Sequence, residues 1–324
     1  MILRPPRLPE EAAAVAALAY PDAPDRLLTA QELLHAEAHR PPQHRHLRLV
    51  AEHDGALVGQ GHLADPSVAA APHRLRLRVS VAARAAGHGV GRALLAALHE
   101  QARAWGATEL LTEAFDPDEH TLRFARAAGY EEYHRRIHAR LELVRAWSEA
   151  RQRELEREAD RLFALDLRVV SLRQLRMAEP DADRRLYELD AALWRDIPFG
   201  VTGEPRSYEE FRAEEITTPG FTPEAVFVAL QARRWVGVCW LERREAGAHI
   251  AMTGVVADLR RRGLARWLKL HAIRWAYEKG IAELRTTNDA PNTAIRALNA
   301  QLGFEATMTE RRLRADLGPA KLEC

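Results

Sequence analysis

Two stretches of the chain place small residues and basic side chains immediately before a helical pattern. One of them reads TGVVADLRRRGLARWLKL, in which three arginines run into Gly263. A helix N-terminus presents unpaired backbone N–H groups and a partial positive charge, and glycine lets a phosphate approach that backbone closely. This arrangement therefore indicates a site for a ligand that contains phosphate groups.

The same arrangement occurs 174 residues earlier, in VSVAARAAGHGVGRALLAALHE. A tight strand-to-helix turn with surface arginines would explain either copy alone, but its repetition at one offset favours a ligand site. The residues expected around the ligand in the second copy are Arg260, Arg261, Arg262, Gly263, Leu264, Ala265 and Arg266. Those expected in the first copy are Gly87, His88, Gly89, Val90, Gly91 and Arg92.

Two common phosphate-binding motifs are excluded by the residues of these turns. A nucleoside-triphosphate loop requires Gly-Lys-Ser/Thr, which neither turn contains. The dinucleotide fingerprint G-x-G-x-x-G fails as well, because the second turn has one glycine and the first has Arg92 after its third. Both turns also follow a strand in the middle of their repeat. A diphosphate-containing cofactor of another kind remains.

The repeat extends well beyond the turn and predicts two similar α/β domains. With a shift of 174 residues, the halves align without a gap from Val81 to Tyr130. Each half predicts a β-hairpin (47–63 and 226–242), a further strand (74–81 and 249–256), a helix after the glycine turn, a short strand, a second helix and a last strand. We expect domains at 1–142 and 166–324, joined by a charged linker helix at 143–165 with an apolar stripe of Val144, Trp147, Leu155 and Leu162.

Both halves resemble the GNAT superfamily of acyl-CoA-dependent N-acyltransferases, whose cofactor loop reads Arg/Gln-x-x-Gly-x-Gly/Ala. The second half carries this loop in full from Arg260 to Ala265, whereas the first half has Ala86 at its leading position. The later family motif is matched only in the second half, by Asn288, Asn292, Asn299 and the closing Leu302-Gly303-Phe304. The resemblance implies that Asn288 and Asn292 contact the cofactor. The resemblance implies tandem GNAT-like domains, each a mixed, mostly antiparallel twisted sheet flanked by helices. It also implies acetyl-CoA or another acyl-CoA as cofactor, with its pantetheine arm entering where the sheet splays.

Acyl transfer to an amine needs an oxyanion donor and a group that accepts the amine proton. The resemblance places the oxyanion donor at a backbone N–H near Val255 or Val256. Glu242 and His249 lie on strands expected to face the cleft and are the candidate bases, with ordinary surface positions as the alternative. Asn299 occupies the position at which many family members carry a tyrosine acid. Its expected role is a hydrogen bond to the sulfur or the rest of the cofactor, and helix packing is the alternative. A thiolate is a tolerable leaving group, so the absence of that tyrosine need not abolish activity.

Recognition of the amine is expected from the first two helices of the second half. Asp190, Asp196 and Glu204 are suited to meet a cationic amine. Trp194 and Phe199 either wall a pocket or belong to the core, and the sequence does not choose between these roles.

The composition excludes several other classes of function. The formal net charge is +1 with no clustered basic face, which argues against nucleic-acid binding. Cys239 and Cys324 are too few for a disulfide framework or a metal site, and Cys239 is expected in the core. No stretch approaches the length of a membrane span, and the N-terminus lacks a signal-peptide pattern. We therefore expect a cytoplasmic monomer or homodimer.

The sequence thus predicts an acetyltransferase that uses acetyl-CoA and a primary amine of a small molecule or peptide. The second half is expected to be catalytic, and the first half structural, regulatory or cofactor-binding. A non-catalytic acyl-CoA-binding or scaffolding protein is the alternative.

Overall fold

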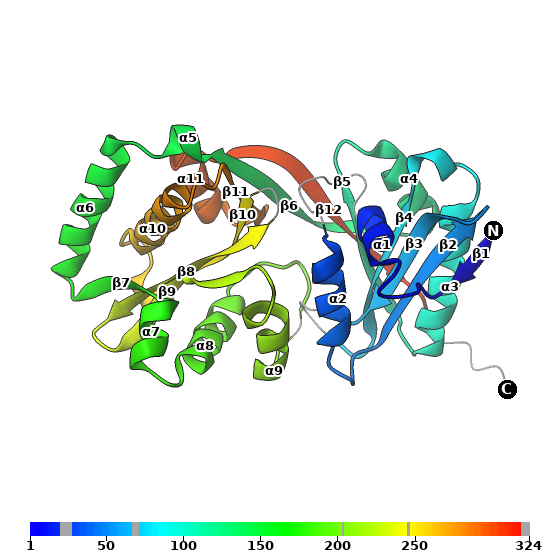
Figure 1. The fold of residues 1–324 in the computed structure, drawn as a ribbon, viewed down its shortest axis with the longest axis horizontal. Coiled ribbons are helices and arrows are strands. Elements are labelled where there is room, and N and C mark those ends of the chain that lie inside the picture. The colour runs from blue at the N-terminus through cyan, green and yellow to red at the C-terminus, as the bar shows by residue number, and fades with distance from the viewer. Residues whose placement is uncertain (20–27, 67–70, 203, 245–246, 319–324) are drawn as a thin grey trace. The chain divides into compact units, whose positions relative to one another are not determined.

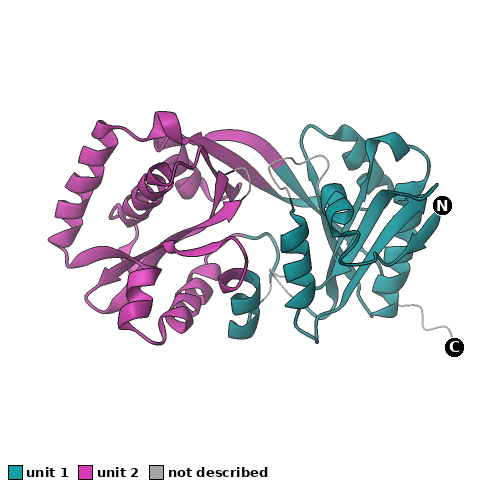
Figure 2. Cartoon of the chain, in the orientation of Figure 1, with its two compact units in different colours: residues 1–135, 199–214, 310–324 teal, residues 136–198, 215–309 magenta. Residues whose placement is uncertain are grey.

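The computed structural model describes residues 1–324 except 20–27, 67–70, 203, 245–246 and 319–324 (Figure 1). The chain forms two compact units, which Figure 2 shows in different colours. Unit 1 comprises residues 1–135, 199–214 and 310–324, and unit 2 comprises residues 136–198 and 215–309. Each unit contains a mixed sheet with flanking helices, which is the α/β class that the repeat predicts.

The sheet of unit 1 has the strand order β1-β2-β3-β4-β5-β12. Its neighbours pair antiparallel except β4 and β5, which pair parallel. The strands are β1 (Ile2–Arg4), β2 (His46–His53), β3 (Ala56–Ala64), β4 (Arg74–Val81), β5 (Glu109–Phe115) and β12 (Glu305–Asp316). The helices are α1 (Ala12–Ala19), α2 (Ala30–Ala38), α3 (Val90–Ala104), α4 (Glu119–Ala127) and the short α9 (Tyr208–Phe211).

The sheet of unit 2 follows the same plan, with the order β6-β11-β10-β9-β8-β7 and a parallel β10–β11 pair. Its strands are β6 (Glu131–Glu142), β7 (Leu167–Ser171), β8 (Phe221–Gln231), β9 (Arg234–Arg244), β10 (Gly247–Val255) and β11 (Glu283–Asp289). Its helices are α5 (Leu143–Ala146), α6 (Glu149–Phe163), α7 (Leu172–Ala178), α8 (Ala182–Trp194), α10 (Leu264–Glu278) and α11 (Thr293–Gln301).

Each unit completes its sheet with the last strand of the other repeat. β6 ends the first repeat yet pairs with β11, where His138 faces Thr287. β12 ends the second repeat yet pairs with β5, where Arg312 faces Glu113. Both partner positions are related by the same offset of 174, so the two exchanges are equivalent. The compact units therefore cut across the boundaries that the sequence suggests at 142 and 166.

The helix after each glycine turn packs on its sheet as the periodicity predicts. In α10, Leu264, Leu268 and Ala272 are buried, while Trp275 is partly buried against the same core. Cys239 on β9 is also buried in this core, which confirms its predicted place. Gly106 and Gly280, which follow α3 and α10, have positive φ angles of 73° and 66°, as is common where a helix ends.

The linker segment forms α5 and α6 rather than one continuous helix. Leu155 and Leu162 of α6 are buried in the core of unit 2, and Trp147 is partly buried against it. The prediction for Val144 was wrong, because its side chain is 83% exposed. Val144 lies on α5, which ends before α6 begins, so one helical stripe does not continue through it. Leu143 is the buried residue of α5.

Neither a membrane-spanning helix nor a metal-binding cluster is found in the described ranges. None of the helices there is long and apolar enough to cross a membrane. The described residues also contain no group of three or more His, Cys, Asp and Glu side chains placed to hold a metal ion.

One charged side chain of α10 lies fully inside the core of unit 2. Lys269 has no exposed surface, and its Nζ has no hydrogen-bond partner among the described residues. The Phe304 ring centroid is 5.3 Å from that Nζ. Burial lowers the pKa of Lys269 to about 8, against a weak opposing effect of the Cys239 thiol. The first repeat has a buried leucine, Leu95, at this position.

We predict that Lys269→Leu stabilises unit 2 by about 3 kcal/mol at pH 7, because it removes the cost of burying a charged amine. The depressed pKa of Lys269 makes the wild type more stable as the pH rises from about 8 toward its unfolded value of 10.5. The leucine variant should lack this gain. Denaturation midpoints at pH 7 and 9.5 test the prediction, with the exposed Lys279→Leu as control. A Lys269→Leu protein no more stable than this control would contradict it.

Candidate functional site

The loop before α10 adopts one backbone shape in both repeats. Arg261 and Gly263 have left-handed φ angles of 63° and 88°, and their counterparts Gly87 and Gly89 have φ angles of 80° and 81°. Two left-handed residues around a single intervening residue turn successive backbone N–H groups toward the helix start, which favours an anion there. Arg261 adopts this shape without being a glycine, so the loop itself imposes the conformation.

The loop of the first repeat is open. Gly87 and Gly89 are exposed, and a Cβ added at either would meet no atom within 4 Å. Gly91 lies in the first turn of α3, and the Phe124 ring is 3.6 Å from where a Cβ of Gly91 would lie. A diphosphate can approach this backbone closely, so the residues present fit the expected cofactor.

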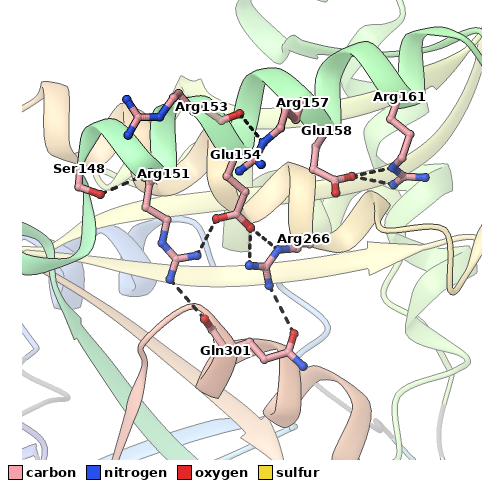
Figure 3. A network of polar contacts seen from close by, with 9 residues as sticks. All are labelled: Ser148, Arg151, Arg153, Glu154, Arg157, Glu158, Arg161, Arg266 and Gln301. Atoms are coloured by element: carbon pink, nitrogen blue, oxygen red, sulfur yellow. Dashed lines mark hydrogen bonds and ion pairs between the residues drawn. The ribbon is translucent and has the colours of Figure 1, made fainter.

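The loop of the second repeat is covered by α6 (Figure 3). A Cβ added at Gly263 would lie 2.5 Å from Nη2 of Arg161, and this guanidinium donates to the Arg262 carbonyl at 2.6 Å. Arg266 Nε donates to Glu154 at 2.7 Å. The backbone of this loop has the same shape as that of the first repeat and fits a diphosphate equally well. Side chains of α6, however, lie against it.

Arg260 and the exposed Arg261 and Arg262 complete this loop. Arg260 Nε donates to the Val255 carbonyl at 3.0 Å, and its guanidinium forms an ion pair with Asp196. Asp196, expected to meet a cationic amine, therefore contacts the loop instead.

The sheet of unit 2 opens beside this loop. β10 and β11 pair only from Ala248–Ile250 with Leu284–Thr286, and β4 and β5 pair over an equally short stretch in unit 1. The Val256 N–H donates to the carbonyl of Val236 on β9 at 3.0 Å, so this N–H is already used in the pairing of the two strands. Alternation along the strand turns the Val255 N–H to the other side, toward β11. Of the two predicted oxyanion donors, only Val255 faces the opening.

Glu242 and His249 face each other on adjacent strands of unit 2. His249 Nε2 lies 3.4 Å from Thr287 Oγ1, which lies 3.2 Å from His138 Nδ1. The four side chains form a row across β9, β10, β11 and β6, called the polar row below. Thr287 and His138 are not among the site residues predicted from the sequence, because His138 reaches the row on an exchanged strand and so leaves no local signal.

The carboxyl group of Glu242 is suited to accept a proton in mildly alkaline solution. Burial raises its pKa to about 8, and the neighbouring Glu215 carboxylate adds to this shift. Arg244 forms an ion pair with Glu242 and opposes the shift only in part. The group is thus largely protonated at pH 7 and becomes a base above pH 8.

The polar row of unit 2 is replaced by charged groups in unit 1. A β-bulge between Ile250 and Met252 shifts the register by one residue, so His249 corresponds to Arg76 in its sheet. Arg76 Nη2 donates to Glu113 at 2.6 Å, and Glu113 faces Arg312 on β12. Ala64 stands opposite Arg76, where unit 2 has Glu242. Arginine cannot accept a proton at neutral pH, whereas the row of unit 2 contains two imidazoles and the Glu242 carboxyl, whose pKa is raised.

The bulge also marks where the row meets the opening of the sheet. Val255 is six residues from His249, roughly 20 Å along a strand, so the two cannot act on one carbonyl group. Ala251 is the extra residue of the bulge. It directly follows Ile250, the last residue of β10 that pairs with β11. A bulge leaves its extra residue outside the ladder. The backbone around Ala251 therefore lies nearer to His249 than the predicted donors.

The asparagines of the later motif have structural contacts. Asn292 is the N-cap of α11 and accepts from the Ile295 N–H, and its counterpart Asp118 caps α4 in the same way. Asn299 is 3% exposed and donates to Asn288 Oδ1 at 2.6 Å. Helix capping and packing thus account for the contacts of these three side chains.

The predicted amine-recognition residues are divided between the units. Asp190 and Trp194 both lie on α8 of unit 2, where Asp190 is buried and Trp194 is the last residue of the helix. Phe199 and Glu204 belong to the segment 199–214, which is part of unit 1.

Comparison with known proteins assigns the family. The sequence profile of the Acetyltransferase (GNAT) family matches the chain twice, over residues 12–130 and 185–304, and the chain belongs to this family. No curated protein matches the sequence significantly.

Solved structures share the tandem fold at low sequence identity. A tandem GNAT protein from the clavulanic acid biosynthesis pathway aligns with a TM-score of 0.74 and 20% identity, over 98% of this chain and 99% of that protein. A GCN5-related N-acetyltransferase from Sphaerobacter thermophilus aligns with a TM-score of 0.70 and 18% identity, over 98% and 96% of the two chains.

We predict that acyl-CoA binds the Arg260–Arg266 loop and that Gly263→Asp weakens this binding by at least tenfold. The new carboxylate would repel the diphosphate, and its Cβ would crowd a left-handed backbone. Calorimetry with acetyl-CoA should be done in a Gly89→Asp background, which closes the loop of the first repeat. Unchanged affinity in a folded double variant would refute the assignment.

Proposed function

We propose that the protein is an N-acyltransferase that transfers an acetyl group from acetyl-CoA to a primary amine of a small molecule or peptide. Catalysis is assigned to unit 2, and unit 1 is assigned a structural, regulatory or cofactor-binding role. The observation that carries this proposal is the polar row, which crosses β10 and β11 beside the opening between these strands. Membership in the acetyltransferase family supports the class of reaction.

Each group of the site has a distinct task in this proposal. Acetyl-CoA, when bound, supplies the thioester carbonyl that the amine attacks. The Arg260–Arg266 loop binds the diphosphate, and the Val255 backbone faces the pantetheine arm. Backbone N–H groups at the Ala251 bulge stabilise negative charge that develops on the carbonyl oxygen. The contacts of Asn299 give it a packing task.

Proton removal is assigned to the polar row. An alkylammonium substrate with a pKa near 10.4 is mostly charged at neutral pH, and it must lose a proton before it can attack. Glu242 is our first candidate to accept this proton because of its raised pKa and buried position. His249 is the second candidate, with Thr287 and His138 holding its ring. The thiolate needs no tyrosine acid, because a thiol pKa is about 8.5.

We predict that kcat/KM rises with pH through about 8, the pKa of Glu242, and does not fall sharply below about pH 9. Glu242→Gln should remove this rise and lower the rate roughly 10²- to 10⁴-fold. His249→Ala should cost less if it only relays the proton, and Asn299→Ala should cost least. The measurement is a pH–rate profile of kcat/KM for these variants.

Glu224→Gln is the control for these profiles, since it removes a half-exposed carboxylate of β8 that pairs with Arg173. Wild-type profiles for both Glu242→Gln and His249→Ala, together with an inactive Asn299→Ala, would place the base elsewhere.

A non-catalytic acyl-CoA-binding protein is the second candidate function. The internal bond between Asn299 and Asn288 and the cover of α6 over the loop favour it. Release of free CoA thiol with a panel of primary amines separates the two candidates. Binding without amine-dependent release across the panel would favour this alternative.

A further inference from the structure

The face of α6 toward the second loop presents two carboxylates at the start of α10. Glu154 accepts from Arg266 Nε at 2.7 Å, and Glu158 Oε2 lies 3.3 Å from where a Cβ of Gly263 would be. Arg161, one turn further along α6, donates to Glu158 at 2.6 Å (Figure 3). The same guanidinium donates to the Arg262 carbonyl at 2.6 Å. Residues 154, 158 and 161 lie on one face of α6, so all three side chains point toward the start of α10.

These carboxylates supply the kind of charge that the loop is built to attract. A helix N-terminus with nearby arginines stabilises anions, whether they are phosphates or carboxylates. Burial of Glu154 favours a higher pKa, but Arg266 and Arg151 outweigh it and lower the pKa below its usual range. Glu154 is thus ionised at neutral pH and neutralises Arg266, which a diphosphate would otherwise do.

The apolar face of α6 keeps the carboxylates in place. Leu155 and Leu162 are buried in the core that includes Leu264 and Trp267 of α10. Arg151 and Arg266 also bond to Gln301 of α11, through its carbonyl and its side chain respectively. Leu155 and Leu162 therefore hold α6 against α10, and the contacts of Glu154 with Arg266 and of Arg161 with the loop add to this packing.

Within the part of the chain that the structure describes, the loop of the first repeat has no such cover. Its loop has the same backbone shape, yet space for an added Cβ is open at both Gly87 and Gly89. α6 follows the first repeat in the chain and packs against the helix of the second loop.

We propose that α6 is an intramolecular competitor of the acyl-CoA diphosphate, in which Glu154 and Glu158 occupy the charge-binding groups of the unit 2 loop until the cofactor displaces them. This inference rests on the proposed binding of acyl-CoA to that loop. It makes the affinity of unit 2 for its cofactor dependent on the linker helix.

Removing the two carboxylates should raise the affinity of unit 2 for acetyl-CoA. The experiment is calorimetry with acetyl-CoA on full-length Gly89→Asp, in which only the second loop is available. Adding Glu154→Gln and Glu158→Gln should tighten binding about tenfold, a coupling within the usual range for linked sites. The matched control adds Glu149→Gln and Glu156→Gln, which change the net charge equally from positions of the same helix that do not contact the loop.

Amide hydrogen exchange gives a readout that does not depend on net charge. Acetyl-CoA should increase exchange in α6 of the Gly89→Asp protein, because the contacts of Glu154, Glu158 and Arg161 with the loop are lost. Equal affinities for the two charge-matched variants, or α6 exchange that stays constant while the loop becomes protected, would overturn the inference and leave the proposed function standing. Absence of acetyl-CoA binding in all three proteins would overturn both.

Discussion

Pairing of each sheet with the last strand of the other repeat is the constraint on which the site depends. An unpaired strand edge exposes a row of backbone donors and acceptors, and β5 and β11 would each present such an edge without β12 and β6. The exchange also determines chemistry, because His138 reaches the polar row only on β6. A site in unit 2 is thereby built from both repeats.

The two repeats keep one backbone and diverge in charge. The left-handed residues of their loops, the caps of α4 and α11, and the short parallel pairs are equivalent. At the level of the polar row, Arg76, Glu113 and Arg312 stand where unit 2 has His249, Thr287 and His138. An ion-paired set favours a fixed structure, whereas imidazoles and a carboxyl with a raised pKa favour proton transfer. This contrast is the physical reason for assigning different tasks to the two units.

Local patterns predicted what depends on local geometry. The repeat, the amphipathic face of α10, the glycine turns and the family resemblance were all readable, because helix periodicity and turn chemistry are encoded within a few residues. Asp118 is the counterpart of Asn292 in the first repeat, and both residue types are favoured at the N-cap of a helix. This pair could have indicated a capping role for Asn292 from the sequence.

The features that were missed depend on contacts between distant segments. Strand exchange, the place of His138 and the cover of α6 over the loop involve pairings that no local periodicity specifies. The bulge at Ala251 moves the register by one residue, which reverses the face of every side chain before it and hides the correspondence of His249 with Arg76. His249 and Val255 were both predicted at one reaction centre, but the six residues between them place them far apart along β10.

A crystal structure of the protein with saturating acetyl-CoA tests the central claim most directly. The account predicts a diphosphate on the Arg260–Arg266 loop, with Glu154 turned away from Arg266 and the thioester beside Ala251 and the polar row. A cofactor bound only to the Gly87–Arg92 loop, with the contact between Glu154 and Arg266 intact, would contradict it.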